Sequence, residues 1–276
     1  MVKGILYVVG TPIGNLEDIS ARAARVLGQV DLIAAEDTRV SGRLLKALDI
    51  KRPLISYYEH NKAVREGELL ARLHSGQNIA LISDAGMPGI SDPGADLLRL
   101  AIAAGLETVI IPGPNAAISA LVLSGLDSSR FTFEGFLPRQ GSKRRAALAL
   151  LSAEQRTMLF YEAPHRLLYT LRDMAALFGT ERAAAAAREL TKLHEEVIRG
   201  SLGELLTHFE QTAPRGEFTL VVAGAPPPLP QVPAESELTA ELAALISAGQ
   251  GRKEAARILA QKYDLPVKYV YGLGLL

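Results

Sequence analysis

Short apolar runs alternate with helix-like segments through the first part of the chain. Strand-like runs span residues 4–9, 31–35, 54–57, 79–82 and 109–111. Helix-like segments lie between them, at residues 20–27, 44–48, 63–73 and 97–102. Runs that are apolar at every position are typical of strands buried on both faces. Alternation of such strands with helices predicts an α/β fold in which helices cover a parallel sheet.

The pattern changes near residue 125. Strand-like runs recur at 131–136, 158–161, 183–188 and 218–223, and helical segments are expected at 143–151, 165–178 and 202–210. We therefore predict two α/β domains, residues 1–124 and 125–225. The run Pro226-Pro-Pro-Leu-Pro230 predicts a stiff linker over residues 226–236. Residues 237–276 are predicted to form a small helical appendage, with helices at 237–246, 252–262 and 267–272.

Three loops rich in glycine and proline follow predicted strands, at residues 10–14, 84–89 and 112–115. Open α/β sheets bind ligands at the carboxyl ends of their strands, so we expect the three loops to line one crevice. Glycine lets the backbone approach a ligand closely, and Asp84 lies within the second loop. The alternative is a set of structural turns, with Asp84 closing its own turn and Asp92 capping the next helix.

Composition narrows the class of protein. The chain has 276 residues, of which 48% are hydrophobic, enough for a substantial core. Thirty basic and thirty acidic residues cancel, which argues against a general nucleic-acid binder. There is no cysteine, and the five histidines lack metal-ligand spacing, so no metal site is expected. No segment has the pattern of a signal peptide or membrane span, and we expect a soluble, cytoplasmic protein.

Five motifs, in this order, resemble those of the tetrapyrrole-methylase-like methyltransferases. They are Gly10-Thr-Pro-Ile-Gly-Asn, Ala35-Glu-Asp-Thr-Arg, Ser83-Asp-Ala-Gly-Met-Pro-Gly, Ile111-Pro-Gly-Pro-Asn and Phe160-Tyr-Glu-Ala-Pro-His-Arg. Within that superfamily they are most similar to the bacterial 16S rRNA (cytidine-1402-2'-O)-methyltransferases. The resemblance implies two α/β domains with S-adenosylmethionine bound in the cleft between them, commonly in a homodimer. It also implies methylation of 16S rRNA within the small ribosomal subunit.

The resemblance further implies which residues bind the cofactor. Matching positions are Gly10, Pro12, Asp84, Ala85, Gly86, Ile90, Asn115, Ala116, Tyr161, Glu162, Ala187, Arg188, Phe218 and Thr219. S-adenosylmethionine carries no phosphate, which agrees with the lack of a lysine-bearing phosphate loop. Asp84 is the first choice for the carboxylate near the amino or ribose group.

No side chain stands out as the base that accepts the ribose hydroxyl proton. Candidates are Glu36 or Asp37, the pair Glu162 and His165, and Lys192 with Glu189; of these we select Asp37, Glu162 and Lys192. Each candidate alone is also explained as a surface charge or a structural pair. Glu162 and His165 in particular flank Pro164, which suits the first position of a helix.

Two basic stretches, residues 39–52 and 138–145, are candidates for phosphate contacts. The predicted RNA-binding residues are Arg39, Arg43, Arg139, Lys143, Arg144 and Arg145, the last four in a flexible clamp that Gly141 and Ser142 make mobile. The alternative for each stretch is a solvated helix face. Residues 251–266 loosely resemble a helix-turn-helix, either a substrate-docking module or a lid packed on the second domain.

A common fold and cofactor do not choose the acceptor. Two other functions therefore stay open at this point. One is a methyltransferase that acts on a small tetrapyrrole, and the other is a non-catalytic RNA-binding assembly protein. The glycine-rich loops argue against the second.

Overall fold

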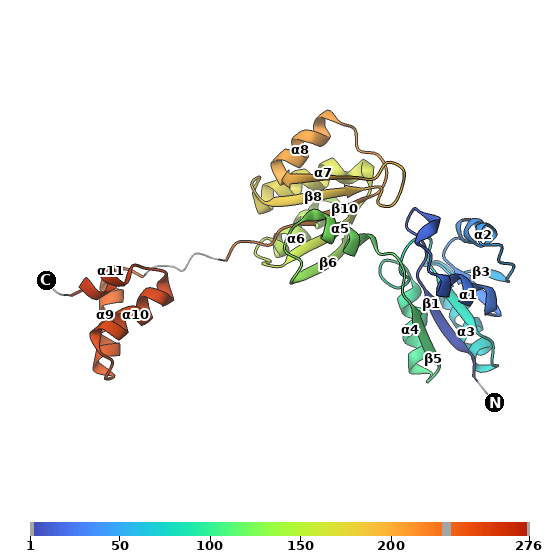
Figure 1. Cartoon of the computed structure of the whole chain (residues 1–276), viewed down its shortest axis with the longest axis horizontal. Helices are drawn as coiled ribbons and strands as arrows, with labels where there is room; N and C mark the ends of the chain where they lie inside the picture. The colour runs from blue at the N-terminus through green and yellow to red at the C-terminus, as the bar shows by residue number, and fades with distance from the viewer. Residues whose placement is uncertain (1–2, 228–232, 275–276) are drawn as a thin grey trace. The chain divides into compact units, whose positions relative to one another are not determined.

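The computed structural model describes residues 3–227 and 233–274 (Figure 1). The chain divides into two compact units, residues 1–225 and 226–276, and each is described by itself. Residues 228–232 of the predicted linker lie outside the described residues. The first helix after the linker begins at Glu235, inside the range predicted for the linker.

The first sheet is parallel throughout, as predicted. Its strands are β1 (Ile5–Val9), β2 (Leu32–Ala35), β3 (Leu54–Ser56), β4 (Ile79–Ile82) and β5 (Glu107–Ile111). The strand order is β3-β2-β4-β1-β5. Every residue of β2 and β4 is buried, because helices cover both faces of the sheet at these strands.

Four helices flank this sheet, preceded by a short 3₁₀ turn, η1 (Leu16–Asp18). They are α1 (Ala21–Gln29), α2 (Thr38–Ala47), α3 (Lys62–His74) and α4 (Gly94–Ala103). Helices α1 and α2 pack on one face, and α3 and α4 pack on the other. The start of α1 is set by Ser20, whose hydroxyl accepts a hydrogen bond from the N–H of Ala23.

The second sheet is mixed. Its strands are β6 (Phe131–Phe136), β7 (Thr157–Glu162), β8 (Ala183–Arg188), β9 (Glu196–Ser201) and β10 (Phe218–Val222). The order is β6-β7-β10-β8-β9, with β6 and β7 parallel and the other pairs antiparallel. The sequence pattern did not predict β9, which is an edge strand with exposed charged residues and therefore lacks a continuous apolar run.

Helices α6 (Gly141–Leu151), α7 (Pro164–Phe178) and α8 (Leu202–Gln211) cover one face of this sheet, and α5 (Ala116–Ser124) covers the other. Helix α5 was not predicted, because it is apolar on all sides and shows no helical period. Its Ala117, Ala120 and Leu121 pack against β7, β8 and β10. Helix α5 lies within the range predicted for the first domain, residues 1–124, but it packs on the second sheet.

The second unit consists of three helices, α9 (Glu235–Ser247), α10 (Arg252–Tyr263) and α11 (Val267–Gly272), in agreement with the predicted helical appendage. They enclose a separate small core that includes Leu238, Leu242, Leu259 and Val270. In the part of the chain that the structure describes, no helix is both long enough and apolar enough to cross a membrane.

Candidate functional site

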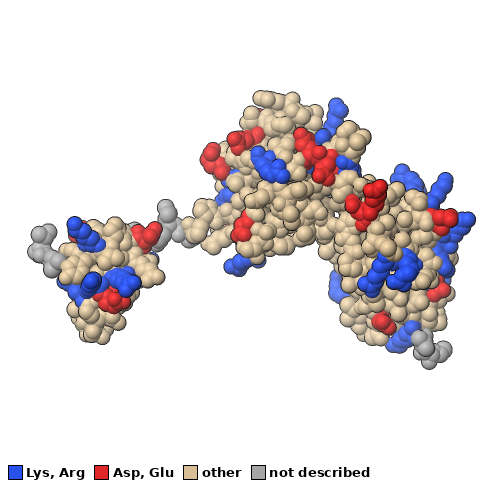
Figure 2. Space-filling model, in the orientation of Figure 1, with Lys and Arg blue, Asp and Glu red and all other residues tan. Residues whose placement is uncertain are grey.

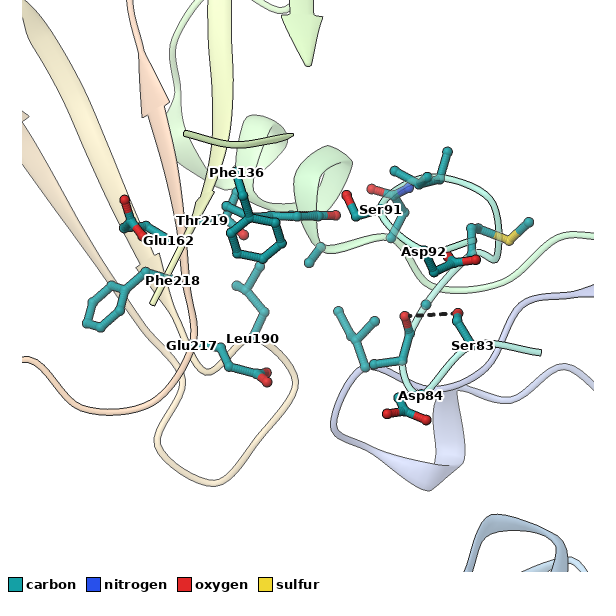
Figure 3. A pocket seen from close by; sticks show the side chains of 18 of the residues that line it. Ser83, Asp84, Ser91, Asp92, Phe136, Glu162, Leu190, Glu217, Phe218 and Thr219 are labelled. Atoms are coloured by element: carbon teal, nitrogen blue, oxygen red, sulfur yellow. Dashed lines mark hydrogen bonds between the residues drawn. The ribbon is translucent and has the colours of Figure 1, made fainter. Parts of the chain in front are cut away.

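A cavity of about 450 Å³ lies between the loops of the first sheet and one face of the second (Figure 3). The first sheet contributes residues that follow the carboxyl ends of its strands: Ile13, Glu36, Ser83 to Met87, Ile90 to Asp92, Asn115 and Ala116. The second sheet contributes Phe136, Tyr161 to Pro164, Ala187, Leu190, Lys192 and Glu217 to Thr219. The three predicted loops thus meet at one crevice.

Backbone hydrogen bonds join the first two loops directly. The N–H of Thr11 donates to the carbonyl of Gly86 (2.9 Å), and the N–H of Gly86 donates to the carbonyl of Thr11 (3.1 Å). Gly86 has a φ of 80°, which favours glycine at this point. Gly10 and Pro12 do not line the cavity. Gly10 instead lies against the backbone of Gly113 in the third loop.

Three carboxylates gather at the rim formed by the first sheet. The Asp92 carboxylate accepts hydrogen bonds from the N–H groups of Gly89 (2.9 Å) and Gly94 (2.8 Å), so it closes the loop before α4. Asp84 Oδ1 accepts from the N–H of Asp37 (2.9 Å), and the N–H of Asp84 approaches Glu36 Oε2 (3.4 Å). Asp92 thus has the capping position considered for it, whereas the carboxylate of Asp84 binds the loop after β2 rather than its own turn, and both residues line the cavity.

Glu36 and Asp84 share an environment that disfavours a negative charge. Burial raises the pKa of Glu36, and the neighbouring charge of Asp84 raises it further. Burial also raises the pKa of Asp84, although the hydrogen bond from Asp37 opposes this change. Carboxyl groups with raised pKa values in a cleft are typical of groups that exchange protons with a ligand.

The environment of Asp37, unlike that of Glu36, favours the charged form of the carboxylate. It caps α2, accepting from the N–H of Arg39 (2.8 Å), and its carboxylate pairs with the Arg39 guanidinium (2.6 Å). The hydrogen bonds from Arg39 lower the pKa of Asp37 to about 2. Asp37 does not line the cavity, so its position does not support the predicted catalytic role.

Strand alternation separates the predicted residues of the second sheet into two rows. Tyr161, Thr219 and Ala187 are aligned across β7, β10 and β8 and belong to the face toward α5 and the cavity. The next row consists of Glu162, Phe218 and Arg188. Figure 3 shows the side chains of Glu162 and Phe218 on the far side of the strands from Asp84.

The contacts of Glu162 explain it as a structural residue and do not support its predicted catalytic role. Its buried carboxylate accepts hydrogen bonds from the Thr170 hydroxyl (2.6 Å) and the N–H of Ala163 (2.9 Å), and it lies 3.3 Å from the Arg166 guanidinium. These bonds hold Glu162 at the start of α7, where Pro164 is the first residue. Its predicted partner His165 is exposed and does not line the cavity.

Lys192 lies at the cavity on a loop with unusual backbone conformation, in which Glu189 and Thr191 have φ values of 50° and 65°. Lys192 Nζ donates to Glu189 (2.9 Å) and Glu217 (2.8 Å). Burial lowers the pKa of Lys192, but the two hydrogen-bonded carboxylates more than offset this, so the net change is upward. Lys192 is thus a protonated cation near neutral pH, and it cannot accept a proton there.

Most of the residues predicted to bind the cofactor line the cavity, and three do not. Those that line it are Asp84, Ala85, Gly86, Ile90, Asn115, Ala116, Tyr161, Glu162, Ala187, Phe218 and Thr219, whereas Gly10, Pro12 and Arg188 do not. Arg188 instead pairs with Glu196 on β9 (3.2 Å). The sequence analysis did not identify five other residues that line the cavity. Ile13 and Met87 lie within the glycine-rich motifs, whereas Phe136, Leu190 and Glu217 lie outside any motif.

The predicted RNA-binding residues differ in their availability. Arg39, Arg43, Arg139, Lys143 and Arg145 are exposed. Arg144 is buried and pairs with Asp173 of α7 (2.8 Å), so it is a packing residue rather than a phosphate ligand. The predicted flexible clamp is also corrected, because Gly141 and Ser142 form the first turn of α6.

Within the described ranges, His, Asp and Glu side chains form no group of three or more that could hold a metal ion.

Two α/β domains with a cavity between the loops of the first sheet and one face of the second are typical of one family of methyltransferases. Residues 5–206 match the family described as Tetrapyrrole (Corrin/Porphyrin) Methylases. Among solved structures, a uroporphyrin-III-C-methyltransferase from Thermus thermophilus is similar with a TM-score of 0.56 and 22% identity, over 80% of this chain and 94% of that one. Cobalt precorrin-4 methyltransferase is similar with a TM-score of 0.58 and 14% identity, over 79% and 94%. At these identities the likeness shows the fold alone.

Curated relatives are much closer in sequence. A protein from Synechocystis sp. named ribosomal RNA small subunit methyltransferase I is 50% identical over 99% of this chain and 98% of its own. Proteins of the same name from Thermotoga maritima (50% identical, 80% of this chain and 99% of the relative) and Escherichia coli O157:H7 (45%, 99% and 95%) are also similar. The chain belongs to the tetrapyrrole methylase family and, within it, to the methyltransferases named ribosomal RNA small subunit methyltransferase I.

Proposed function

We propose that the protein uses S-adenosylmethionine to methylate the 2'-hydroxyl of cytidine 1402 in 16S rRNA of the small ribosomal subunit. One observation carries the choice of RNA as the acceptor: 50% identity over nearly the whole chain to a relative named for that substrate. The tetrapyrrole enzymes share the fold at 14–22% identity, which does not favour a tetrapyrrole acceptor.

The cavity fits S-adenosylmethionine in size and in the chemistry of its walls. A volume of about 450 Å³ suits a small-molecule site. The ligand carries a positive sulfonium and an ammonium group, and Glu36, Asp84 and Asp92 supply negative charge at the rim. Ile90 and Phe136 supply apolar surface for the adenine ring, and the glycine-containing turn at 84–86 exposes backbone groups.

When bound, the cofactor supplies a methyl group activated by its positive sulfur, so the chain must orient the acceptor hydroxyl and take its proton. We assign the proton acceptor to Glu36, which lines the cavity, whereas Asp37 does not and the Glu162 carboxylate lies on the far face of the second sheet. Burial moves the pKa of Glu36 upward, toward the range in which a carboxylate is an effective base.

We propose that Lys192 acts through its positive charge rather than as a base. Its ammonium group holds Glu189 and Glu217 together, and it places one positive charge at the cavity wall. The exposed cations Arg39, Arg43, Arg139, Lys143 and Arg145 are proposed to contact RNA phosphates.

The proposed assembly is a homodimer. Helix α5 exposes Ile118 and Val122, which lie one turn apart, and Val122 is 71% exposed. Apolar side chains that are adjacent and uncovered mark surfaces for protein association. A ribosomal substrate also implies that the protein works in the cytoplasm.

Transfer of a labelled methyl group from S-adenosylmethionine to three separate acceptors tests the proposal. The acceptors are small ribosomal subunits that lack the modification, free 16S rRNA and a porphyrinogen. We expect label in RNA, free or within the subunit, and none in the porphyrinogen. Label in the porphyrinogen alone, or in no acceptor although the protein binds the cofactor, would contradict the proposal.

A further inference from the structure

We propose that the C-terminal unit is an accessory RNA-docking module, which binds RNA through the surface of α10 and α11. The inference rests on the proposed RNA substrate. It concerns residues other than those of the cavity, since the described cavity residues all belong to the first unit.

The unit has the organisation of a small independent domain. Buried residues from all three helices, among them Leu238 of α9, Leu259 of α10 and Val270 of α11, form one hydrophobic cluster. The guanidinium of Arg252 donates to the carbonyls of Tyr271 and Leu273, which fixes the end of α11 against the start of α10. Side chains of α10 and α11 that are not part of this core include the exposed Arg257 and Lys268.

Charge is divided unevenly among the three helices. Helix α9 carries Glu235, Glu237 and Glu241 and no basic residue. The segment from α10 to α11 carries five basic residues, Arg252, Lys253, Arg257, Lys262 and Lys268, against two acidic ones, Glu254 and Asp264. On the face of this unit seen in Figure 2, Lys and Arg side chains are more prominent than Asp and Glu. The net positive segment suits a polyanion.

Three of the basic side chains are not used within the unit. Arg252 binds the end of α11, and Lys262 pairs with Glu241 (2.9 Å). Lys253, Arg257 and Lys268, by contrast, are exposed and form no salt bridge with any described residue. Lys253 and Arg257 lie one turn apart on the same side of α10, so both can reach one stretch of RNA backbone.

Helix α11 adds an exposed aromatic ring to these cations. Tyr269 is 45% exposed and directly follows Lys268. Nucleic-acid bases stack on such rings irrespective of sequence, and neighbouring cations hold the phosphates. An exposed tyrosine beside unpaired cations favours RNA over an acidic protein surface, which offers no bases to stack.

Comparison with the relatives supports an accessory rather than a catalytic role. The relative from Thermotoga maritima is matched over 99% of its own length by a segment of 221 residues, close to the extent of the first unit, residues 1–225. A methyltransferase of the same name is therefore about as long as the first unit alone. The C-terminal unit is thus expected to change RNA affinity, and not the chemical step.

Binding of full-length variants to a 16S rRNA fragment, measured at several salt concentrations, tests the inference. The triple variant K253A/R257A/K268A is expected to bind at least about tenfold more weakly, and the slope of log affinity against log salt should fall by about 0.7 to 0.9 for each lost contact. The triple variant K253R/R257K/K268R keeps the charges and should retain most of the affinity. Tyr269→Ala is expected to weaken binding about tenfold without changing the salt slope.

Unchanged circular dichroism and cofactor affinity would show that the variants are folded. RNA affinity and a salt slope equal to those of the unaltered protein would overturn the inference. So would unchanged affinity for the rRNA fragment together with weaker binding to whole small subunits, because the three cations would then not act on this RNA. Failure of the unaltered protein to methylate any RNA would contradict the proposed function itself, and the two failures are therefore distinguishable.

Discussion

Gly10 and Gly113 face each other so closely that neither position has room for a side chain. A β-carbon on Gly10 would lie 2.7 Å from the Cα of Gly113, and one on Gly113 would lie 2.8 Å from the backbone of Gly10. The two residues follow β1 and β5, which are neighbouring strands. Their contact lets the loops after both strands turn toward the same cavity.

Replacing Gly113 by Ala should therefore separate the two loops and weaken cofactor binding. Because the obstruction is backbone, we expect a cost of about 1 to 3 kcal/mol in the free energy of unfolding. Cofactor affinity should fall at least about tenfold, equivalent to about 1.4 kcal/mol. Isothermal calorimetry and urea unfolding measure the two effects.

Gly67→Ala is the matched control for this substitution. Gly67 lies within α3, where an added β-carbon meets nothing within 4 Å. The variant should gain up to about 1 kcal/mol in stability and bind the cofactor normally. Equal cofactor affinity in Gly113→Ala and Gly67→Ala would rule out the proposed role of the glycine contact.

Arg144 and Lys143 are adjacent basic residues with opposite expected roles. Arg144→Ala deprives the partly buried Asp173, whose side chain is 16% exposed, of its nearest partner and should cost about 1 to 3 kcal/mol of stability. Lys143→Ala should leave stability within about 0.5 kcal/mol and weaken RNA binding. Thermal unfolding and RNA titration of both variants check the assignment, and it is wrong if Arg144→Ala lowers RNA affinity while its unfolding temperature stays unchanged.

The sequence pattern was most informative where burial is uniform. Strands β2 and β4 are apolar at every position, and their parallel arrangement followed from the alternation with helices. Helix α5 and strand β9 were not predicted, for opposite reasons. Helix α5 is apolar on all sides, whereas β9 is a polar edge strand. Local periodicity carries no signal in either case.

The sequence motifs predicted which strand ends form the candidate site. They did not predict which side of the sheet each side chain occupies. The motif Phe160-Tyr-Glu-Ala-Pro-His-Arg places Tyr161 and Glu162 together, although successive side chains of a strand point to opposite faces. Only the observed register shows that Tyr161 shares the cavity face with Thr219. The pairing of Arg144 with Asp173, 29 residues apart, was likewise invisible in a local charge count.

Glu36→Gln should make the protein more stable at neutral pH while impairing the reaction. Burial raises the folded-state pKa of Glu36, so the folded chain retains this proton to a higher pH than the unfolded chain does. Ionisation of Glu36 therefore destabilises the fold as pH rises through that raised pKa. The neutral glutamine should remove this pH-dependent loss, which urea unfolding between about pH 4 and pH 7 would detect.

Asp31→Asn provides a control for the Glu36 substitution, because Asp31 accepts a hydrogen bond from the Asn78 N–H outside the cavity. That variant should not gain stability at neutral pH. A Glu36→Gln variant less stable than the unaltered protein at pH 7 would contradict the destabilising burial of its charge.

The proposed homodimer can be tested at α5. Val122→Asp places a charge on the exposed apolar side of this helix, and it should shift the mass measured by light scattering from dimer toward monomer. Leu150→Asp is a matched control on α6, since Leu150 is 87% exposed. Loss of the dimer in both variants, or in neither, would show that α5 does not form the interface.

The most direct test of the central claim is the position of the methyl group that the protein adds to small-subunit RNA. Mass spectrometry of nuclease fragments, after reaction with S-adenosylmethionine, should locate one new methyl group on the ribose of cytidine 1402. Glu36→Gln, assayed with saturating S-adenosylmethionine, should add it at least about a hundredfold more slowly, as expected for loss of a general base. A methyl group on a base or on another nucleotide would contradict the proposed reaction, and an undiminished rate in Glu36→Gln would contradict the role assigned to Glu36.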